Sequence, residues 1–586
     1  MAQTGAEILV STLTDLGVEY VFGYPGGAVL PIYDALYNSD LKHILTRHEQ
    51  GAIHAADGYA RSSGKTGVVV ATSGPGATNL VTGLANAHMD SVPLVAITGQ
   101  VHSSLIGKDS FQEADIMGIT MPITKHNYLV KKVDDISRVI KEAFHIASTG
   151  RQGPVLVDIT KDALMDIASE NHKNVVVDLP GYRVKTEGHP RQILLAQDLI
   201  KKSKKPLIYA GGGAQKAQES LVLMAEKLDI PVTTTLMGLG AFPSNHHLNL
   251  GMLGMHGTPF ANMAVQNCDL LIAVGARFDD RVTGNIEKFA PYAKIIHIDI
   301  DAAEISKNIK ADVPIVGDVR DILPKLITDK KMNHHEWLNE IRGFKLPQKV
   351  AEAPKGDECK KCSSPSLYHS EMPPPCRKKN SLRPKLVLET VAKILGDKMV
   401  VVTDVGQNQM WAAQYLPIDK PQSFLTSGGL GTMGYGLPAA VGAQIARPNE
   451  QVLLVTGDGS LQMNIQELAT IATYNIPVKV VLLNNRVLGM VRQWQTIFYE
   501  SRYSETCTGS LPDFCLLAKA YSIPSIRLTD HDNLVSKLEE VLQFNGPYFI
   551  EVAIDPDESV WPMVAPGAAL CEMLHAEMAP TPSWER

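Results

Sequence analysis

Apolar residues in this chain gather in short continuous runs, and longer segments with helical periodicity separate the runs. The runs are rich in Val and Ile and lack polar alternation, as in strands of parallel sheets that are buried on both faces. The pattern predicts strands at residues 18–22, 67–72, 94–98, 155–159, 206–209, 269–274, 295–298, 399–403, 452–456 and 478–484. Strands that alternate with helices in this way predict an α/β fold.

Three blocks of such alternating elements divide the chain and predict three doubly wound parallel-sheet domains. We expect domains at residues 1–170, 190–340 and 384–556, a polar linker at 171–189 and a C-terminal tail at 557–586. Residues 348–383 are low in apolar content and crowded with Pro, Ser and charge, which predicts an insertion loop. Glycine-rich turns follow many of the strands, and ligands gather at the carboxyl ends of strands in open parallel sheets.

Composition and charge exclude several classes of protein. The 586 residues carry a formal net charge of −7 and no long basic run, which argues against nucleic acid as a partner. No apolar stretch approaches the roughly 20 residues of a transmembrane helix, so no membrane partner is expected. The first basic residue is Lys42, and seven scattered cysteines make no disulfide framework. We therefore expect a cytoplasmic enzyme.

A candidate cation site lies in the third block. Asp458 stands between two glycines directly after the strand predicted at 452–456, and Asn485 follows the strand predicted at 478–484. A carboxylate and an amide at neighbouring strand ends can converge on Mg²⁺, which prefers oxygen ligands and takes further ones from substrate phosphates. The glycines let the backbone approach a diphosphate. The alternative is a pair of ordinary strand-end turns, but the combination is typical of thiamin-diphosphate enzymes.

A candidate acid–base group lies in the first block. Glu49 follows a short apolar segment and precedes an Ala-rich helix. Taken alone, a Glu at a helix start is more often a cap that interacts favourably with the helix dipole than a catalyst. A thiamin-diphosphate enzyme needs one carboxylate against N1′ of the aminopyrimidine, because that hydrogen bond favours the tautomer that takes the proton from C2 of the cofactor. Glu49 is our candidate for this role.

Long and specific strings show a resemblance that covers nearly the whole chain outside the insertion. They are YPGGA at 24–28, SGPGATN at 73–79, DSFQE at 109–113, LGMHG at 253–257, RFDDR at 277–281, GGLGTMG at 428–434 and GMVRQW at 489–494. With these strings the chain resembles the catalytic large subunits of the acetohydroxyacid synthase (acetolactate synthase) family. The resemblance implies the thiamin-diphosphate-enzyme fold with three cofactors: thiamin diphosphate, Mg²⁺ and FAD.

The resemblance also implies where the first two cofactors bind. Residues expected at thiamin diphosphate are Gly27, Ala28, Glu49, Pro75, Asn79, Val405, Gly406, Gln407, Asn408, Gly431, Met433, Gly457, Asp458, Gly459, Ser460, Asn485, Val487, Gly489 and Met490. Asp458, Asn485 and the backbone carbonyl of Val487 are expected to hold Mg²⁺. Met433 resembles the apolar wedge that keeps the cofactor bent, although core packing alone would also explain a methionine there. Asn408 departs from the family, in which His is more frequent; either residue can donate to a diphosphate oxygen.

The middle block resembles the family's flavin domain, in which FAD is required but takes no net redox part. Residues expected at FAD are Phe111, Arg151, Gly211, Gly212, Gly213, Leu253, Gly254, Met255, His256, Gly275, Ala276, Arg277, Asp279, Asp299, Ile300, Gly317 and Asp318. Glycines at strand ends suit a dinucleotide, but the triple glycine lacks the full GxGxxG pattern. The resemblance further implies a homodimer or homotetramer with active sites between subunits, and a possible separate small regulatory subunit.

The expected catalytic residues are Glu49, Gln112, Lys161, Arg281 and Trp494. A guanidinium can bind a 2-oxo acid in a bidentate manner, so Arg281 is the candidate carboxylate partner; the alternative is a surface ion pair with Asp279 or Asp280. Trp494 can shape a pocket that prefers ethyl over methyl on the second substrate, or it can be a core residue.

The expected reaction is decarboxylation of pyruvate on thiamin diphosphate, followed by transfer of the hydroxyethyl unit to a second pyruvate or to 2-oxobutanoate. The products would be 2-acetolactate or 2-aceto-2-hydroxybutyrate, in branched-chain amino-acid synthesis. Alternatives are a pyruvate oxidase, a glyoxylate carboligase, a catabolic acetolactate synthase, or a silent paralogue that acts as a scaffold. Glu49 argues against the carboligase, which lacks that carboxylate.

The insertion is the one segment that the resemblance does not explain. It holds Cys359, Cys362, His369 and Cys376, and three thiolates with an imidazole at this spacing are a possible structural zinc site. A loop with incidental cysteines is the favoured interpretation.

Overall fold

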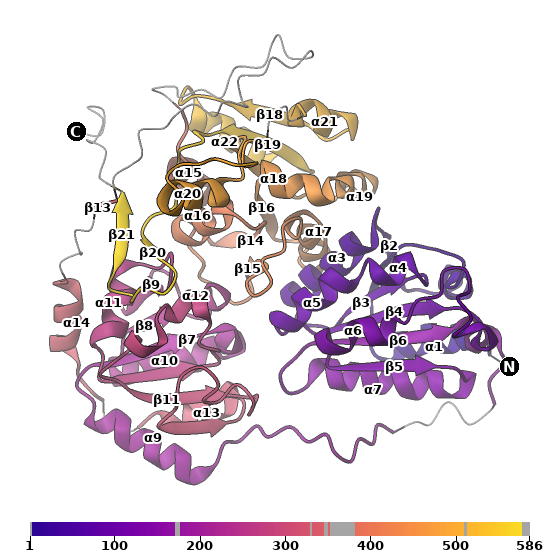
Figure 1. The fold of residues 1–586 in the computed structure, drawn as a ribbon, viewed down its shortest axis with the longest axis horizontal. Coiled ribbons are helices and arrows are strands. Elements are labelled where there is room, and N and C mark those ends of the chain that lie inside the picture. Colours follow the sequence, from indigo (N-terminus) through magenta and orange to yellow (C-terminus); the bar gives the residue numbers. More distant parts are fainter. Residues whose placement is uncertain are drawn as a thin grey trace.

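The computed structural model describes residues 3–169, 176–328, 331–344, 350–351, 381–508 and 512–576. Three six-stranded sheets, each with helices around it, make up most of this part of the chain (Figure 1). All strand pairs within these three sheets are parallel, which confirms the predicted α/β fold with three parallel-sheet domains. The candidate zinc ligands Cys359, Cys362, His369 and Cys376 lie outside the described residues.

The first sheet has the strand order β2-β1-β3-β4-β6-β5. Its strands are β1 (Tyr20–Gly23), β2 (Lys42–Leu45), β3 (Gly67–Ala71), β4 (Leu94–Gln100), β5 (His126–Val130) and β6 (Pro154–Thr160). One core lies under α1 (Gly5–Asp15), α2 (Leu30–Tyr37) and α7 (Ile136–Ser148). The opposite core lies under α3 (Glu49–Ser63), α5 (Val81–Met89) and α6 (Ile116–Thr120). Both faces are therefore buried, which explains the unbroken apolar runs.

The third sheet repeats this arrangement with the order β15-β14-β16-β17-β19-β18. Its strands are β14 (Met399–Thr403), β15 (Phe424–Leu425), β16 (Gln451–Gly457), β17 (Lys479–Asn484), β18 (Ser525–Leu528) and β19 (Tyr548–Ala553). Helices α15 (Pro384–Leu395), α16 (Gln407–Tyr415) and α22 (Leu534–Gln543) cover one core. Helices α17 (Gly436–Ala446), α19 (Leu468–Tyr474) and α21 (Phe514–Ala520) cover the other.

The middle sheet has a different order, β12-β11-β10-β7-β8-β9. Its strands are β7 (Pro206–Ala210), β8 (Val232–Thr234), β9 (Asn249–Met252), β10 (Leu270–Val274), β11 (Lys294–Asp299) and β12 (Val313–Val316). Helices α9 (Pro190–Lys202), α10 (Gln218–Leu228) and α13 (Val319–Leu326) cover one core, and α11 (Pro259–Asn267) and α14 (His335–Arg342) cover the other. Numbered by their place in this domain, the strands run 3-2-1-4-5-6, the order of dinucleotide-binding sheets.

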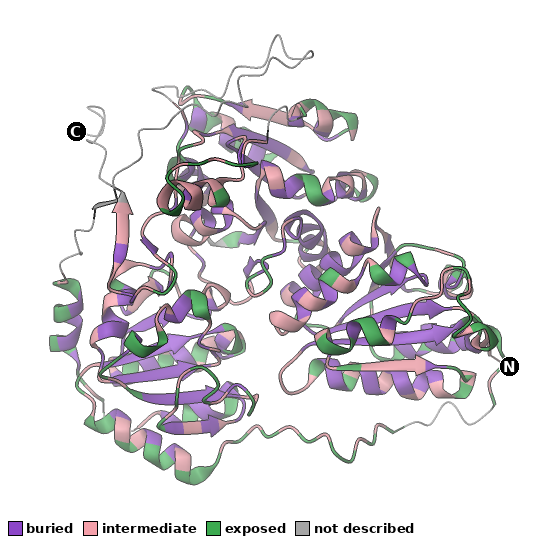
Figure 2. Ribbon diagram, in the orientation of Figure 1, coloured by how far each residue is buried: buried purple, intermediate pink, exposed green. Residues whose placement is uncertain are grey.

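The three sheets lie within the ranges predicted for the three domains, whose bounds stay a prediction. All ten predicted strands are present, with ends within two residues of the prediction. They are central strands, and Figure 2 shows them as buried over most of their length. Residues 176–189 run without a helix or a strand between α8 (Lys161–Met165) and α9.

Part of the predicted tail packs on the middle domain. It contributes β20 (Met563–Val564) and β21 (Met573–Ala576), which pair with each other and, through β21, with β13 (Val350–Ala351). Val564 donates its backbone N–H to the carbonyl of Met255 at 2.8 Å. The tail therefore closes over the middle domain beside the segment at 253–256.

Helix α3 of the first domain packs along α17 of the third (Figure 1). Two glycines permit this contact: a Cβ on Gly58 would lie 2.1 Å from the carbonyl oxygen of Ala439, and a Cβ on Gly442 would lie 1.8 Å from that of Ala55. The two helices occupy equivalent places in sheets of equivalent order. The first and third domains therefore meet through a reciprocal, backbone-close contact.

Candidate cofactor and substrate sites

Each group of candidate residues lies at the carboxyl edge of its sheet. In the first domain the candidates follow β1, β2, β3, β4 and β6; these are Gly27 and Ala28, Glu49, Pro75 and Asn79, Gln112, and Lys161. In the third domain they follow β14, β16 and β17, namely residues 405–408, 457–460 and 485–490. Parallel strands bring these turns together although the chain separates them widely.

Glu49 begins α3 and is 9% exposed. Its helix is already capped, since the Nδ1 atom of His48 accepts from the backbone N–H of Gln50 at 3.0 Å. The Asn79 side chain donates to Oε2 of Glu49 at 3.0 Å. A Cβ on Gly76 would lie 3.2 Å from the other carboxylate oxygen, so the glycine leaves that oxygen accessible. Glu49 is therefore a fixed carboxylate with one oxygen free to meet a ligand.

The loop after β4 exposes Phe111 and leaves Gln112 half-buried. Phe111 is 89% exposed, and Gln112 takes a left-handed backbone conformation with its Cα atom against Gly74. Gln100 anchors the end of the loop by donating to the carbonyl of Ala114 at 2.9 Å. Lys161, at the start of α8, is also exposed. Phe111 and Lys161 are therefore exposed at the sheet edge that also carries Glu49.

The third-domain edge is buried instead. Asp458 is 1% exposed, and burial raises the pKa of its carboxyl to about 7. The Thr508 hydroxyl donates to it at 3.4 Å, and no described residue forms an ion pair with it. The oxygen of the Asn485 carboxamide accepts from the N–H of Val487 at 3.2 Å and has a lone pair left. A buried carboxylate with no cation beside an amide oxygen fits the donor set of Mg²⁺.

A carboxamide network fixes this edge. The Asn485 amide donates to Oε1 of Gln407 at 3.2 Å, and the Gln407 amide donates to Gln493 at 3.0 Å. A Cβ on Gly489 would lie 2.0 Å from the Gln407 oxygen, so only glycine fits. Asn408 points inward, because its amide donates to the carbonyls of Asp404 and Val455. In this conformation both Asn408 amide hydrogens are engaged by the backbone.

The glycine-rich loop with Gly431 and Met433 is tied to the first domain. Its backbone N–H groups at Gly428 and Gly429 donate to Asp90 at 3.0 and 2.7 Å. The methyl group of Met433 lies 3.6 Å from where a Cβ on Gly459 would stand. The hydroxyl of Ser460 donates to the Val405 carbonyl at 2.6 Å. The expected cofactor residues of the third domain thus contact one another.

In the middle domain the two glycine turns meet where the strand order reverses, between β7 and β10. A Cβ on Gly211 would lie 2.2 Å from the Gly275 oxygen, and Gly275 has a left-handed φ of 57°. Asp299, which is buried at the end of β11, has its pKa raised to about 6 by burial. Dinucleotides bind at this point in sheets of this order, so the turns fit FAD.

A cavity of about 970 Å³ lies where all three domains meet, and its lining includes Met89, Ser91 and Gly150 of the first domain. Its lining includes most of the expected flavin residues, namely Arg151, Gly211–Gly213, Leu253, Met255, His256, Gly275–Arg277, Asp279, Asp299, Ile300, Gly317 and Asp318, together with Val405, Gly431, Met490, Arg281 and Trp494. Phe111, Gly254, Glu49, Gln112 and Lys161 do not line it.

The cavity brings Arg281 and Trp494 together. The Arg281 guanidinium lies 5.8 Å from the centroid of the Trp494 ring, and its ion pair with Asp280 is long, at 3.8 Å, and exposed. The indole N–H of Trp494 is buried without a partner among the described residues. Arg151 forms an ion pair with Glu304 at 2.6 Å and so joins the first and middle domains. Arg281 is therefore available to a carboxylate at the cavity.

Sequence reasoning did not single out a buried polar network beside the third-domain edge. Asp404 directly follows β14, accepts from the N–H of Gly434 at 2.8 Å, and has its pKa raised to about 6 by burial. Asp57 of α3 accepts from Arg61 at 2.6 Å and from the Tyr435 hydroxyl at 2.8 Å. A carboxylate after a predicted strand would have pointed to Asp404, but no sequence signal pairs Asp57 with Tyr435.

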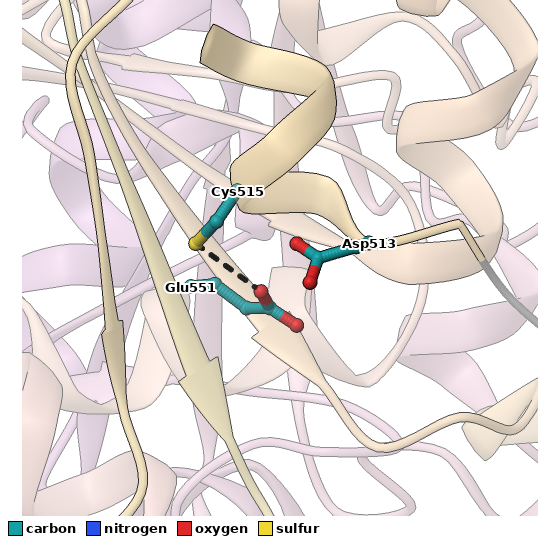
Figure 3. Close-up of side chains that lie close together, drawn as sticks. All are labelled: Asp513, Cys515 and Glu551. Atoms are coloured by element: carbon teal, nitrogen blue, oxygen red, sulfur yellow. Dashed lines mark hydrogen bonds between the residues drawn. The ribbon is translucent and has the colours of Figure 1, made fainter. Parts of the chain in front are cut away.

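Asp513, Cys515 and Glu551 form a second cluster of possible metal ligands (Figure 3). Arg527 already forms ion pairs with Asp513 at 2.7 Å and with Glu551 at 2.8 Å. The Asn484 amide donates to the other Glu551 oxygen at 2.8 Å. A guanidinium therefore supplies the positive charge in this cluster, which supports the turn that carries Asn485.

Comparisons with known proteins agree with this arrangement. Residues 3–119, 193–326 and 404–552 match the N-terminal TPP-binding, central, and C-terminal TPP-binding domains of thiamine pyrophosphate enzymes. The probable acetolactate synthase large subunit of Methanocaldococcus jannaschii is 50% identical over 97% of this chain and 95% of its own length.

Two bacterial relatives are similarly close. The acetolactate synthase of Mycobacterium leprae is 50% identical over 97% of this chain and 89% of its own. The acetolactate synthase isozyme 3 large subunit of Escherichia coli is 48% identical over 97% and 98%. Among the described residues, every helix is too short or too polar to cross a bilayer.

Proposed function

The chain belongs to the acetolactate synthase large subunits of the thiamine pyrophosphate enzyme family, and on this premise we propose that it forms 2-acetolactate from pyruvate. The observation that carries the proposal is identity of 50% with such a subunit over 97% of the chain. The intact candidates Glu49, Asp458 and Asn485 support a catalytic chain over a silent scaffold. With 2-oxobutanoate as second substrate, the product would be 2-aceto-2-hydroxybutyrate.

Thiamin diphosphate, when bound, supplies the carbanion chemistry of decarboxylation and carbon–carbon bond formation. We assign its pyrimidine end to the first-domain edge, where Glu49 has one carboxylate oxygen free and Asn79 holds the other. Glu49 would accept and return a proton at N1′ of the pyrimidine. We assign the diphosphate to the turns of the third-domain edge, with Met433 as the apolar support between the two ends.

Mg²⁺ is assigned to Asp458, the Asn485 carboxamide oxygen and the Val487 carbonyl. The buried, unpaired carboxylate of Asp458 supports this assignment, because a divalent cation would offset the energy of burying its charge. The cation would neutralise and orient the diphosphate. FAD is assigned to the middle-domain edge, supported by the strand order and by the glycine turns at its reversal point.

A dimer is the smallest assembly that we propose. The cavity carries Arg281 and Trp494, whereas Glu49, Gln112 and Lys161 lie on the first-domain edge away from its lining. The first domain also exposes large apolar side chains, namely Tyr24, Leu30, Leu105, Phe111, Ile119 and Met121. Such side chains favour an interface. A second copy would bring its first-domain edge to the cavity of the first copy and complete the site.

In the completed site, Arg281 would bind the carboxylate of the second 2-oxo acid, and Trp494 would form the wall against its alkyl group. The cation–π arrangement of these two side chains supports a shared role, since it directs the guanidinium along the cavity wall. Gln112 and Lys161 would contact the substrates from the partner copy. The "large subunit" in the names of the relatives supports a separate regulatory subunit as a further partner.

The deciding experiment measures acetolactate formed from pyruvate by purified protein, with thiamin diphosphate, Mg²⁺ and FAD omitted one at a time. We expect activity that needs all three and a flavin that stays oxidised when pyruvate is added. Rapid bleaching of the flavin would identify a pyruvate oxidase, and activity in flavin-stripped protein would identify a catabolic synthase. No product with all three cofactors present would contradict the proposal.

A further inference from the structure

A carboxylate of the third domain reaches into the start of α3. Glu467 ends the 3₁₀ segment η9 (Gln462–Glu467) and is 1% exposed. Its two oxygens accept from the backbone N–H of Arg47 at 3.0 and 3.2 Å. The hydroxyl of Thr470 donates to the same carboxylate at 2.6 Å and fixes its orientation. The bound N–H lies only two residues before Glu49.

The Glu467 carboxylate packs closely against the start of α3. A Cβ on Gly51 would lie 2.3 Å from Oε1 of Glu467, so the carboxylate fits only because residue 51 is glycine. Burial raises the pKa of Glu467, while the Thr470 hydroxyl and the N–H groups of Arg47 and His48 oppose that rise. A buried carboxylate that accepts several hydrogen bonds is held in one place. The position of residues 47–48 is thereby set by the third domain.

Capping of α3 does not explain this carboxylate. The helix has its own cap in the His48 side chain, which accepts from Gln50. Glu467 instead accepts from Arg47, which precedes the cap residue and lies outside the helix. The side chain therefore fixes the approach of the chain to Glu49 rather than completing a helix end.

The segment that carries Glu467 also contacts the third-domain edge. It begins with α18 (Asp458–Leu461), whose first residue is the expected Mg²⁺ ligand. In its middle, the Asn464 amide donates to the carbonyl of Gly434, next to Met433, at 2.8 Å. Asn464 has a non-helical φ of −135°, and the resulting kink separates these two contacts. One short segment thus touches the turn of Asp458, the Met433 loop and the chain before Glu49.

We propose that Glu467 is a positioning residue for Glu49: it holds the start of α3 so that the Glu49 carboxylate stands at the height that the cofactor pyrimidine needs. Glu467 touches neither cofactor nor substrate and acts only through Glu49. The inference rests on the proposed function, since it takes Glu49 as the proton-exchanging carboxylate. On this proposal, residues 458–467 also connect Asp458, the expected Mg²⁺ ligand, rigidly with Glu49 of the same chain.

The test is Glu467→Gln in the holoenzyme with thiamin diphosphate, Mg²⁺ and FAD. The amide keeps the shape but sets an N–H₂ group against backbone donors, which displaces residues 47–49. A displacement of about 1 Å can lower turnover roughly 100-fold. We expect kcat to fall about 10- to 100-fold, while the Kd for thiamin diphosphate, measured by fluorescence quenching, stays within about threefold.

A second readout needs no substrate. Exchange of the C2 proton of bound thiamin diphosphate with deuterated water reports what Glu49 does to the cofactor. We expect this exchange to slow by about the same factor as kcat in Glu467→Gln. Gly51→Ala should reproduce both effects, because its methyl group displaces the carboxylate without changing a charge. Thr473→Val is the matched control: it removes the exposed partner of the Arg47 side chain, which lies 3.0 Å away, and should leave both rates within about twofold.

A double-mutant cycle separates positioning from general stability. If Glu467 acts through Glu49, the Glu49→Gln/Glu467→Gln protein exchanges no more slowly than Glu49→Gln alone. Losses that add in the double variant, or rates of Glu467→Gln and Gly51→Ala within twofold of wild type, would overturn the inference. A wild type that exchanges C2 but makes no acetolactate would contradict the proposed function and leave this cycle interpretable.

Discussion

The first and third domains have sheets of the same strand order, but the side chains at the carboxyl edges of the two sheets differ in burial. Their strand orders are equivalent, and the equivalent helices α3 and α17 pack on each other. The third-domain edge buries Asp458 and Asn485 in a network of amides. The first-domain edge carries the buried carboxylate of Glu49 together with exposed side chains such as Phe111.

This difference shows that two sheets with the same strand order can carry turns of different burial and charge at equivalent positions. The turns after equivalent strands β3 and β16 read SGPG and GDGS, so a change of a few residues places a carboxylate, our proposed Mg²⁺ ligand, in an otherwise neutral turn. The strands keep the turns in place because both faces of each sheet are buried. The middle domain, with another strand order, offers a crevice for a dinucleotide instead.

The largest effect should come from the first-domain edge. Glu49→Gln removes the carboxylate that we assign to proton exchange with the cofactor and should lower kcat by about 10²- to 10⁴-fold. The Kd for thiamin diphosphate should change little, because we assign the diphosphate to the third-domain edge. Steady-state kinetics with a binding titration checks this, and near-normal turnover would refute the role of Glu49.

Substitution at the third-domain edge should instead weaken the binding of Mg²⁺. Asp458→Asn removes a ligand charge and should weaken Mg²⁺ binding by at least the roughly 10- to 100-fold seen when outer-shell partners of metals are lost. Excess Mg²⁺ should restore part of the activity. Asp198→Asn, which breaks an exposed ion pair with Lys202 in the middle domain, is the control and should leave the Mg²⁺ dependence unchanged.

A smaller effect is expected where the cavity meets the third domain. Trp494→Leu opens the pocket wall and should lower the preference for 2-oxobutanoate over pyruvate by about tenfold, since one methylene is worth roughly 1–3 kcal/mol. Product ratios under mixed substrates measure this change. Phe498→Leu, whose ring packs edge-on against Trp494 at 5.5 Å, should shift the ratio less; an unchanged ratio in both variants would remove Trp494 from substrate selection.

The contact between the two domains can be tested without catalysis. In Gly58→Ala the new methyl group meets the Ala439 carbonyl and should destabilise the α3–α17 contact by about 1–3 kcal/mol, as overpacking does. A lower Tm in calorimetry is the expected result. Gly181→Ala, which has no heavy atom within 4 Å of the added Cβ, is the control. If both variants melt at the same temperature, the helices are not held as closely as the structure indicates.

The smallest effect concerns two buried acids on equivalent strands. Asp158 of β6 has only neutral partners, Thr98 and Gln100, and burial raises its pKa from 3.8 to about 7. The folded protein therefore holds a proton that the unfolded chain has lost, so this group makes stability fall as pH rises from about 4 to 7.

Asp158→Asn removes that titration. We expect its Tm to vary less between pH 5 and pH 8 than that of wild type, because the variant has no proton to lose in this range. Glu551→Gln on β19 should instead lower the Tm, because it leaves Arg527 without one of its two anionic partners. Parallel pH curves for Asp158→Asn and wild type would contradict the assignment.

The apolar pattern of the sequence predicted central strands but not the strands at the sheet edges, and the reason is physical. The ten predicted strands are all central, whereas β2, β5, β9, β12, β15 and β18, which form the sheet edges, are absent from the prediction. Most edge strands are only partly buried, as β5 is, and so lack unbroken apolar runs, whereas β15 is buried but has only two residues. Two central strands were also not predicted. In β19 the charged Glu551 interrupts the apolar run, and β8 has only three residues.

The candidate site was also only partly contained in the sequence. Motif strings supplied the candidates Asp458, Asn485 and Glu49, since each directly follows a strand or begins a helix. The inward turn of the Asn408 amide and the pairing of Arg281 with Trp494 depend on contacts between segments far apart in the chain. No local pattern records such contacts.

By itself, the sequence determined the fold class, the family, and the turns that carry chemistry, because local apolar runs and short strings encode all three. Tertiary structure alone decided which turns are buried and which project, and which domain holds the start of α3. The hydrogen bond from Arg47 to Glu467 joins residues of two domains, and it forms only because Gly51 leaves room. Burial and close approach are properties of the packed chain, so they are decided only when the domains meet.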